Sequence, residues 1–243
     1  MQTTIKSGIR AAFRLCGYDL HKYQPMTSFP EVRGLLLRRQ GVQCVIDGGA
    51  NVGAYGRQLR SHGYCRRILS IEPQAGAFTQ LRDEAAGDPK WDCVRCALGE
   101  RDGTTMSLNV TSNSVSSSLL PMSEKMQQLF SAASFSHTES VDVRSLDALI
   151  QEGPLRDQPL FLKLDVQGYE DRVLAGAEKT LRHTVGIQLE LAIEPLYEGA
   201  QPMVAMIHTL NSMGYVLAAV TPNTFHPATS HLLEVDAMFA RFE

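Results

Sequence analysis

The sequence lacks the features that define several classes of protein. No stretch approaches the roughly 20 consecutive apolar residues of a membrane-spanning helix. The formal net charge is only -3, so the basic excess typical of nucleic-acid-binding proteins is missing and no nucleic acid is expected as a partner. Arg10 and Arg14 interrupt the apolar residues near the start, which is unlike a secretory signal peptide. These absences favour a cytoplasmic protein.

Cysteine is scarce, and its placement argues against two kinds of site. The chain has 5 cysteines, an odd number that does not suggest a disulfide framework. Cys93 and Cys96 have C-x-x-C spacing, but no second pair of cysteines or histidines completes a zinc site. They also fall in a predicted strand, where residues three apart face opposite sides. We therefore expect reduced thiols and no bound metal.

Apolar runs alternate with helix-like segments along most of the chain, which is typical of a parallel sheet covered by helices. Helices are predicted at 54–62, 76–87 and 202–213. Strands are predicted at 43–47, 67–73, 91–98, 160–166, 185–191, 215–220 and 232–242. This pattern predicts an α/β fold: a doubly wound, Rossmann-like seven-stranded sheet with helices on both faces. The last strand is expected to close the sheet at its edge.

Two regions interrupt the alternation. Residues 1–40 are predicted to be a basic helical extension of the domain formed by residues 41–243, because they carry far more Lys and Arg than Asp and Glu. Residues 111–140 are rich in serine and irregular, with a short helix expected after Ser123. An insertion of this length in a compact domain is usually functional or disordered. We interpret residues 111–140 as a lid over the site.

The stretch "VIDGGANVGAYG" (45–56) joins the first strand to a helix by a glycine-rich turn. Such a turn places backbone N–H groups and a helix N-terminus beside a ligand. A dinucleotide fingerprint, G-x-G-x-x-G, requires glycine where Ala50 stands. The spacing instead fits D-x-G-x-x-x-G, with Asp47, Gly49 and Gly53. The missing glycine weakens a pyrophosphate site, although a nicotinamide-dependent oxidoreductase stays open as an alternative.

An acidic residue at the end of the second strand points to a nucleoside. Glu72 lies 19 residues after Gly53, and a carboxylate in this position accepts hydrogen bonds from ribose hydroxyls. Asp47 beside the turn favours a ligand without phosphate and with positive charge. S-adenosylmethionine meets both demands, since it has a ribose, an ammonium group and a sulfonium group. The alternative is a tight structural turn in which Asp47 caps the helix.

Further motifs follow the turn in a fixed order. They are "IEPQ" (71–74), "CALGERDG" (96–103), "SVSSSLL" (114–120), "VDVRSLDAL" (141–149), "LKLDVQGYEDRVLAGAEKTL" (162–181) and "LELAIEPLYEGA" (189–200). With these motifs the chain resembles the FkbM-type methyltransferases from about Cys44 onward, although Gly48 replaces an apolar residue of the family pattern. The resemblance implies transfer of a methyl group from S-adenosylmethionine to a hydroxyl of a sugar, a glycolipid or a polyketide-type metabolite. A cofactor-binding scaffold without turnover is the non-enzymatic alternative.

The strand ends and the resemblance together suggest the residues of the site. Acceptor contacts are expected from Ser117, Ser118, Lys163 and Glu170. Cofactor contacts are expected from Asp47, Gly49, Ala50, Asn51, Gly53, Glu72, Pro73, Ala97 and Asp165.

A hydroxyl acceptor must lose its proton as it attacks, so a general base is expected. The candidates are Asp165, Glu190 and His137. By resemblance, Asp165 contacts the methionine part of the cofactor or the acceptor hydroxyl. Each candidate has a structural alternative: a helix cap for Asp165, a salt-bridged strand end for Glu190, a solvated loop side chain for His137. Likewise, the alternative for Lys163 is a simple ion pair with Asp165, and the alternative for Glu170 is a favourable charge at the start of a helix.

Two amphipathic segments suggest partners. Met126, Leu129 and Phe130 share one helical face, which either packs on the core or lines the mouth of a site for a small-molecule or glycolipid acceptor. In the N-terminal segment one face carries Ile5, Ile9, Ala12, Phe13 and Cys16. We expect this helix to dock on the domain. Weak contact of residues 1–20 with the inner membrane surface is the alternative. The oligomeric state is left open.

Overall fold

The computed structural model describes residues 2–18, 28–130, 134–151 and 155–242, with side chains from residue 8 onward. Its main element is a seven-stranded sheet with the strand order β3-β2-β1-β7-β8-β10-β9. The first five strands in this order are parallel, and β10 runs antiparallel to both of its neighbours. The strands are β1 (Cys44–Gly48), β2 (Arg67–Ile71), β3 (Trp91–Val94), β7 (Leu160–Leu164), β8 (Thr184–Ala192), β9 (Val216–Phe225) and β10 (Leu232–Ala240). The predicted seven-stranded α/β sheet is confirmed.

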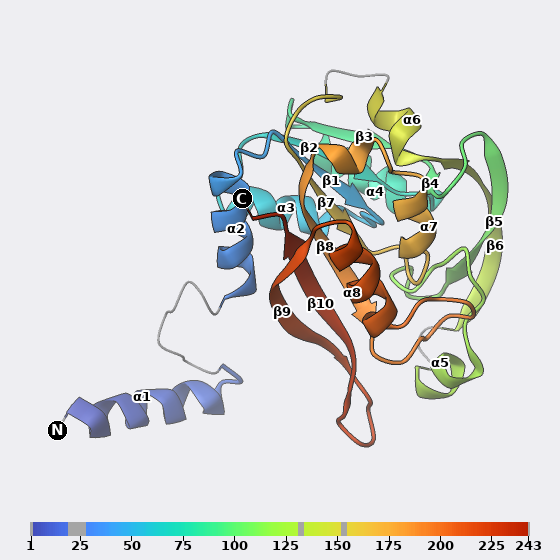
Figure 1. The fold of residues 1–243 in the computed structure, drawn as a ribbon. Helices are drawn as coiled ribbons and strands as arrows, with labels where there is room; N and C mark the ends of the chain where they lie inside the picture. Colours follow the sequence, from blue (N-terminus) through green and yellow to red (C-terminus); the bar gives the residue numbers. More distant parts are fainter. Residues whose placement is uncertain (1, 19–27, 131–133, 152–154, 243) are drawn as a thin grey trace.

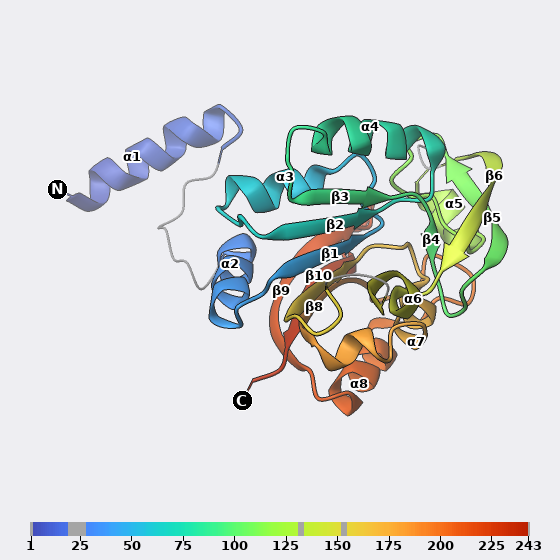
Figure 2. The ribbon, with the colours of Figure 1, turned by 90° about the horizontal axis from the view of Figure 1, so that it is seen from above.

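Helices cover both faces of this sheet (Figure 2). One face carries α2 (Phe29–Arg39), α3 (Ala54–Ser61) and α4 (Ala75–Ala85). The other face carries α6 (Leu146–Gln151), α7 (Glu170–Ala175) and α8 (Met203–Ser212), with a short 3-10 helix, η3 (Thr180–Arg182). Each layer has its own apolar core against the sheet.

The central strands are mostly apolar because both of their faces are buried. Asp47 of β1 and Lys163 of β7 are the charged exceptions, and they pair with each other. In β7, Phe161 packs in the core beneath α2 and α3, whereas Leu160, Leu162 and Leu164 pack beneath α7 and α8. Packing on both faces therefore holds the strands in place, and the turns at their carboxyl ends lie at one edge of the sheet.

The predicted position of the last strand was wrong. β10 lies between β8 and β9, and β9 forms the edge of the sheet. The two strands form an antiparallel hairpin, so β10 pairs on both sides and is almost wholly buried. β9 instead exposes apolar side chains, among them Val216, Val220 and Phe225.

The predicted third strand, 91–98, divides between two sheets. Its first part is β3, and its second part is β4 (Ala97–Leu98), which joins a three-stranded sheet in the order β4-β6-β5. Here β5 (Thr104–Thr111) pairs antiparallel with β6 (Phe135–Arg144), and both lie beside the main sheet (Figure 1). The short helix expected after Ser123 is present as α5 (Glu124–Leu129), and the 111–140 segment is less irregular than predicted because it also contains the start of β6.

The N-terminal part of the chain forms two helices. Leu36 and Leu37 of α2 pack in the core with Val42. The domain boundary at residue 40 stays a prediction. α1 (Gln2–Leu15) lies apart from the sheet (Figure 1). Its described side chains are exposed, Ile9 by 48% and Phe13 by 45%, so the expected docking is not observed. Across the described residues, none of the helices combines the length and apolarity needed to cross a bilayer.

Candidate active site

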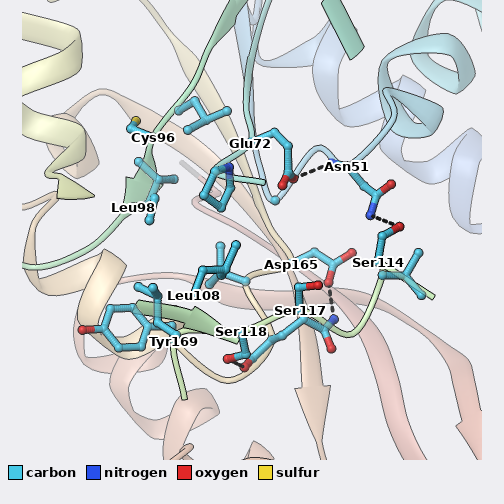
Figure 3. Close-up of a pocket in the computed structure, with 18 residues that line it drawn as sticks. Asn51, Glu72, Cys96, Leu98, Leu108, Ser114, Ser117, Ser118, Asp165 and Tyr169 are labelled. Atoms are coloured by element: carbon cyan, nitrogen blue, oxygen red, sulfur yellow. Dashed lines mark hydrogen bonds between the residues drawn. The ribbon is translucent and has the colours of Figure 1, made fainter. Parts of the chain in front are cut away.

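The carboxyl ends of β1, β2 and β7 meet at one edge of the sheet, where open α/β folds bind their ligands. A pocket of about 660 Å³, including its open mouth, lies at this edge. Predicted site residues from five segments line it (Figure 3): Gly49, Asn51, Glu72, Pro73, Ala97, Ser117, Ser118 and Asp165.

Gly49 allows the turn after β1 to touch the loop after β7. Its φ is +73°, and a Cβ atom there would lie 1.9 Å from the backbone oxygen of Asp165. Asn51 is also left-handed, with φ 47°. Its side-chain oxygen accepts a hydrogen bond from Val52 N at 2.8 Å, which stabilises this conformation. Only glycine fits at position 49.

Glu72 is held at the pocket wall by backbone donors. Its Oε2 accepts from Asn51 N at 2.8 Å (Figure 3), and its Oε1 accepts from Gln74 N at 2.8 Å. A carboxylate has about four acceptor positions, so positions remain for the two hydroxyls of a ribose. Burial raises the pKa of Glu72 to about 7, against the two backbone hydrogen bonds that lower it. The carboxylate and the apolar side chains around it fit a nucleoside.

Asp47 does not face the pocket, which corrects its prediction as a cofactor contact. It is fully buried, its Oδ1 lies 3.0 Å from Lys163 Nζ, and Ser70 Oγ donates to its Oδ2 at 3.3 Å. The charge of Asp47 is thus balanced by a lysine instead of a ligand cation. This pairing also explains why an acidic residue is tolerated before the turn.

Lys163 is likewise a support and not an acceptor contact. Its Nζ donates to Gly49 O at 3.1 Å and lies 3.5 Å from Asp165 Oδ2. Burial lowers the pKa of Lys163, but the neighbouring carboxylates of Asp47 and Asp165 outweigh it and raise the pKa overall. The lysine stays charged and links the turn after β1 to the loop after β7.

Glu170 shapes that loop from the inside. Its Oε1 accepts from Val166 N at 3.1 Å and from Gly168 N at 3.3 Å, and its side chain is buried. Burial raises its pKa to about 7. Gln167 and Gly168 both have left-handed backbones, with φ 55° and 90°. Glu170 therefore holds the loop and does not line the pocket beside Asp165.

A second cavity, here called the acceptor groove, adjoins the pocket and has about 1130 Å³ of space, open solvent included. The two share Val115, Asp165 and Gln167. The groove is further lined by Asn113, Ser116, Met126, Leu129, Phe130, Glu190, Leu196, Asn223, Thr224 and Glu234. One wall is thus apolar and the other carries carboxylates and amides. The face of Met126, Leu129 and Phe130 meets both of its expected alternatives, because it lines the groove while Met126 and Phe130 also pack in a small buried cluster.

Of the predicted catalytic residues, Glu190 lies in this groove alone and Asp165 lies at its junction with the pocket. Glu190 Oε2 accepts from Gln167 Nε2 at 2.8 Å, and its Oε1 accepts from Asn223 Nδ2 at 2.5 Å. Its pKa is raised well above the ordinary value, first by burial and then by the charges of Asp165 and Glu234. A carboxylate with a raised pKa is suited to accept a proton near neutral pH.

Four other predicted residues lie outside the pocket or have a hydroxyl that is already hydrogen-bonded. Ala50 and Gly53 lie in the turn but do not line the pocket, and Gly53 begins α3 with φ 83°. Ser118 lines the pocket, but its hydroxyl donates a hydrogen bond to Gln167 O at 2.7 Å. His137 lines neither cavity, and its exposed ring lies 3.4 Å from Glu139 Oε1.

Residues that the sequence did not suggest complete the two cavities. Tyr169 and Leu108 close the pocket, while Asn223 and Glu234 reach the groove from the β9–β10 hairpin. Gln167 lay inside a recognised motif, but Asn223 and Glu234 carried no signal because nothing local indicates that the hairpin borders the site. Within the described residues, no three His, Cys, Asp or Glu side chains are arranged to hold a metal ion.

Solved methyltransferase structures are similar in outline. The rRNA methylase from Streptococcus thermophilus matches with a TM-score of 0.47 and 9% identity, covering 92% of this chain and 100% of that one. Precorrin-6y C5,15-methyltransferase from Geobacter metallireducens GS-15 gives a TM-score of 0.44 and 12% identity, over 91% and 93% of the two chains.

Sequence comparison is more specific. The 2-O-methyltransferase NoeI of Sinorhizobium fredii (strain NBRC 101917 / NGR234) is 26% identical over 178 residues, which are 71% of this chain and 72% of the relative. The model of the methyltransferase FkbM domain matches residues 47–217, more than half of the chain. The predicted family and cofactor are confirmed, and the oxidoreductase alternative is set aside. The chain belongs to the FkbM methyltransferase family and is an S-adenosylmethionine-dependent methyltransferase.

Proposed function

We propose that this methyltransferase acts on a hydroxyl of a sugar-bearing acceptor, such as a glycolipid, bound in the acceptor groove. The observation that carries the proposal is the junction at Asp165, where a pocket that fits a nucleoside meets a groove lined by carboxylates and amides. Such groups hydrogen-bond to polyols, and the apolar wall at Leu129 and Phe130 suits a lipid or aglycone. The similarity to a 2-O-methyltransferase supports an oxygen acceptor.

In this proposal the pocket residues hold the cofactor in a set orientation. Glu72 accepts the ribose hydroxyls, and the turn at Gly49 and Asn51 allows close backbone approach. Pro73 and Ala97 supply apolar surface for the base. Asp165 lies where the pocket meets the groove, and its negative charge there favours the cationic part of the ligand.

The groove residues handle the proton. When bound, S-adenosylmethionine supplies an electrophilic methyl group and leaves as the neutral sulfide, so the attacking hydroxyl must give up one proton. Glu190 accepts that proton in the proposal, because it lies in the groove and its pKa is raised by burial and by Asp165. Positioning of the two reactants supplies much of the remaining rate.

Two further proposals concern segments around the groove. Residues 111–140 act as a lid, since α5 and the serine-rich stretch border both cavities. Contact of residues 1–20 with an anionic membrane surface would bring a glycolipid acceptor close. Co-sedimentation with anionic vesicles at low salt tests it, and absence of binding would exclude it.

A labelled-methyl assay tests the function. The purified protein is incubated with methyl-labelled S-adenosylmethionine and a panel of methyl glycosides, glycolipids, polyketide-type alcohols and amines. We expect label on a sugar hydroxyl, and a loss of about 100-fold or more in Asp165→Asn. Asp83→Asn, on the exposed surface of α4, is the control. Label on amines or polyketides only, or cofactor binding without any transfer, would contradict the proposal.

A further inference from the structure

Gln167 joins the cofactor pocket to the acceptor groove. Its Nε2 donates to Asp165 Oδ1 at 2.6 Å and to Glu190 Oε2 at 2.8 Å, and its Oε1 accepts from the Tyr197 hydroxyl at 2.6 Å. The amide has two N–H groups, and each is used on a different carboxylate. The orientation of the amide is thereby determined, because the reversed amide would place its oxygen against both carboxylates.

The backbone of Gln167 is fixed as firmly as its side chain. Its φ of 55° is uncommon for a residue other than glycine, asparagine or aspartate. The Ser118 hydroxyl donates to its backbone oxygen at 2.7 Å, and Glu170 holds the amides on either side. A left-handed residue that is held from several sides is typical of functional sites.

We propose that Gln167 is a positioning residue that clamps Asp165 and Glu190 into one arrangement, so that Glu190 faces the acceptor hydroxyl while Asp165 stays directed at the cofactor. The inference rests on the proposed function of Glu190 as the proton acceptor. Gln167 itself takes no proton in this scheme.

The surroundings of Glu190 show why a neutral double donor is needed there. Asp165 and Glu170 approach it from the loop and helix after β7, and Glu234 and Asp236 approach from β10. Lys163, a buried lysine nearby, pairs instead with Asp47 and Asp165. The carboxylate of Glu190 is held by the side-chain amides of Gln167 and Asn223, so Gln167 offsets repulsion among several acids.

The clamp also reaches the serine-rich segment. The Tyr197 hydroxyl lies 2.6 Å from Gln167 Oε1 and 3.0 Å from the backbone oxygen of Ser116, and it has one hydrogen to share between them. Ser116 lines the acceptor groove. Movement of the segment around Ser116 therefore changes the hydrogen bond that Gln167 receives.

Gln167→Glu and Gln167→Met test the clamp separately. The first keeps the shape but removes both donors and adds a charge, and the second removes every hydrogen bond of the side chain. The pKa of Glu190 is followed by NMR in protein labelled with ¹³C at the glutamate carboxyl, with Glu190→Gln to assign the signal. Cofactor affinity is measured by calorimetry. Gln58→Glu, at an exposed position of α3 where Arg33 of α2 stays its partner, is the matched control.

We expect the pKa of Glu190 to rise by about one unit or more in both Gln167 variants, and more in Gln167→Glu, because the donors that favour its charged form are lost. Methyl transfer to the acceptor found in the panel should fall by about 100-fold, with the acid limb of its pH profile moved upward. Gln58→Glu should change neither quantity.

An unchanged pKa of Glu190 in Gln167→Met, with a lower melting temperature only, would make Gln167 a structural loop residue and overturn the inference. The NMR measurement needs no acceptor, so this failure is distinct from failure of the proposed function. If Gln167→Glu does not fold, Gln167→Met decides alone.

Discussion

Two of the acidic residues of the site, Glu72 in the pocket and Glu190 in the groove, are held by different kinds of partner. Glu72 accepts from the backbone amides of Asn51 and Gln74, which lie within a few residues of the turn and strand that form the pocket. Glu190 accepts from the side chains of Gln167 and Asn223, which come from a loop and from a distant hairpin. Backbone donors do not depend on residue type, whereas side-chain donors change with each substitution.

This difference matches what each cavity recognises in the proposed function. The cofactor of the family is the same ligand in each reaction cycle, and a pocket built on backbone geometry suits a constant ligand. The groove draws its walls from α5, from residues 113–116 and from the β9–β10 hairpin. A groove of side chains can be altered for a different acceptor without disturbing the strand ends.

Because the pocket is built on backbone geometry, the largest effect is expected from a substitution at Gly49. Gly49→Ala places a Cβ atom 1.9 Å from the Asp165 backbone oxygen at a φ of +73°, so the turn after β1 and the loop after β7 must separate. We expect loss of measurable cofactor binding by calorimetry and a fall in melting temperature. Gly76→Ala is the control, because no atom lies within 4 Å of its added Cβ. Normal binding by Gly49→Ala would show that the pocket tolerates backbone change.

The second-largest effect is expected when the Glu72 carboxylate is removed. Glu72→Ala removes the acceptor for the ribose hydroxyls, and with it the acceptor of the Asn51 and Gln74 backbone amides. We expect cofactor affinity to fall by about 2–5 kcal/mol in calorimetry, the loss of two charge-assisted hydrogen bonds. Transfer at saturating cofactor should fall far less. Unchanged affinity would place the ribose elsewhere in the pocket.

The same difference explains which parts of the site could be predicted from sequence. Gly49, Asn51 and Glu72 follow strands at fixed spacings, so a local pattern was enough to place them in one pocket. The spacing could not show which way a side chain points. Asp47 precedes Gly49 in the motif, yet its side chain lies beneath the turn beside Lys163.

Long-range pairing was harder to predict, both in the fold and in the groove. Alternating apolar runs gave the seven strands, but not that β10 inserts between β8 and β9. The serine-rich composition of 111–140 hid the start of β6, whose pairing with β5 joins segments more than 20 residues apart. Asn223 reaches Glu190 only because of the hairpin, so no local pattern indicates it.

A smaller effect, on stability, is expected at Glu170, which supports the loop between the two cavities. Its pKa is raised to about 7 by burial, above the ordinary 4.5. The protonated side chain therefore stabilises the fold fully below about pH 4.5, and this contribution is lost as the pH rises through 7. The amide in Glu170→Gln would stay neutral and still accept from Val166 N, so this variant should match the wild type at pH 5 and exceed it at pH 8.

The measurement is urea unfolding of Glu170→Gln and wild type at these two pH values, with an expected gain of about 1–3 kcal/mol at the higher one. Glu100→Gln, at an exposed position, is the control and should give no pH-dependent difference. An equal difference at pH 5 and pH 8 would mean that Glu170 is already ionised in the folded protein.

The smallest effect is expected at His137, because this residue lines neither cavity. Its side chain is 55% exposed, and its neighbour Glu139 keeps its hydrogen bond from Ala75 N at 3.0 Å when the ring is removed. His137→Ala should therefore change the free energy of unfolding by no more than about 0.5 kcal/mol. Its transfer rate should stay within about twofold of wild type, while Glu190→Gln loses about 100-fold in the same assay. If the two variants lost activity equally, the proton would leave through β6 and not through the groove, and the contrast between Glu72 and Glu190 would no longer describe the two halves of the reaction.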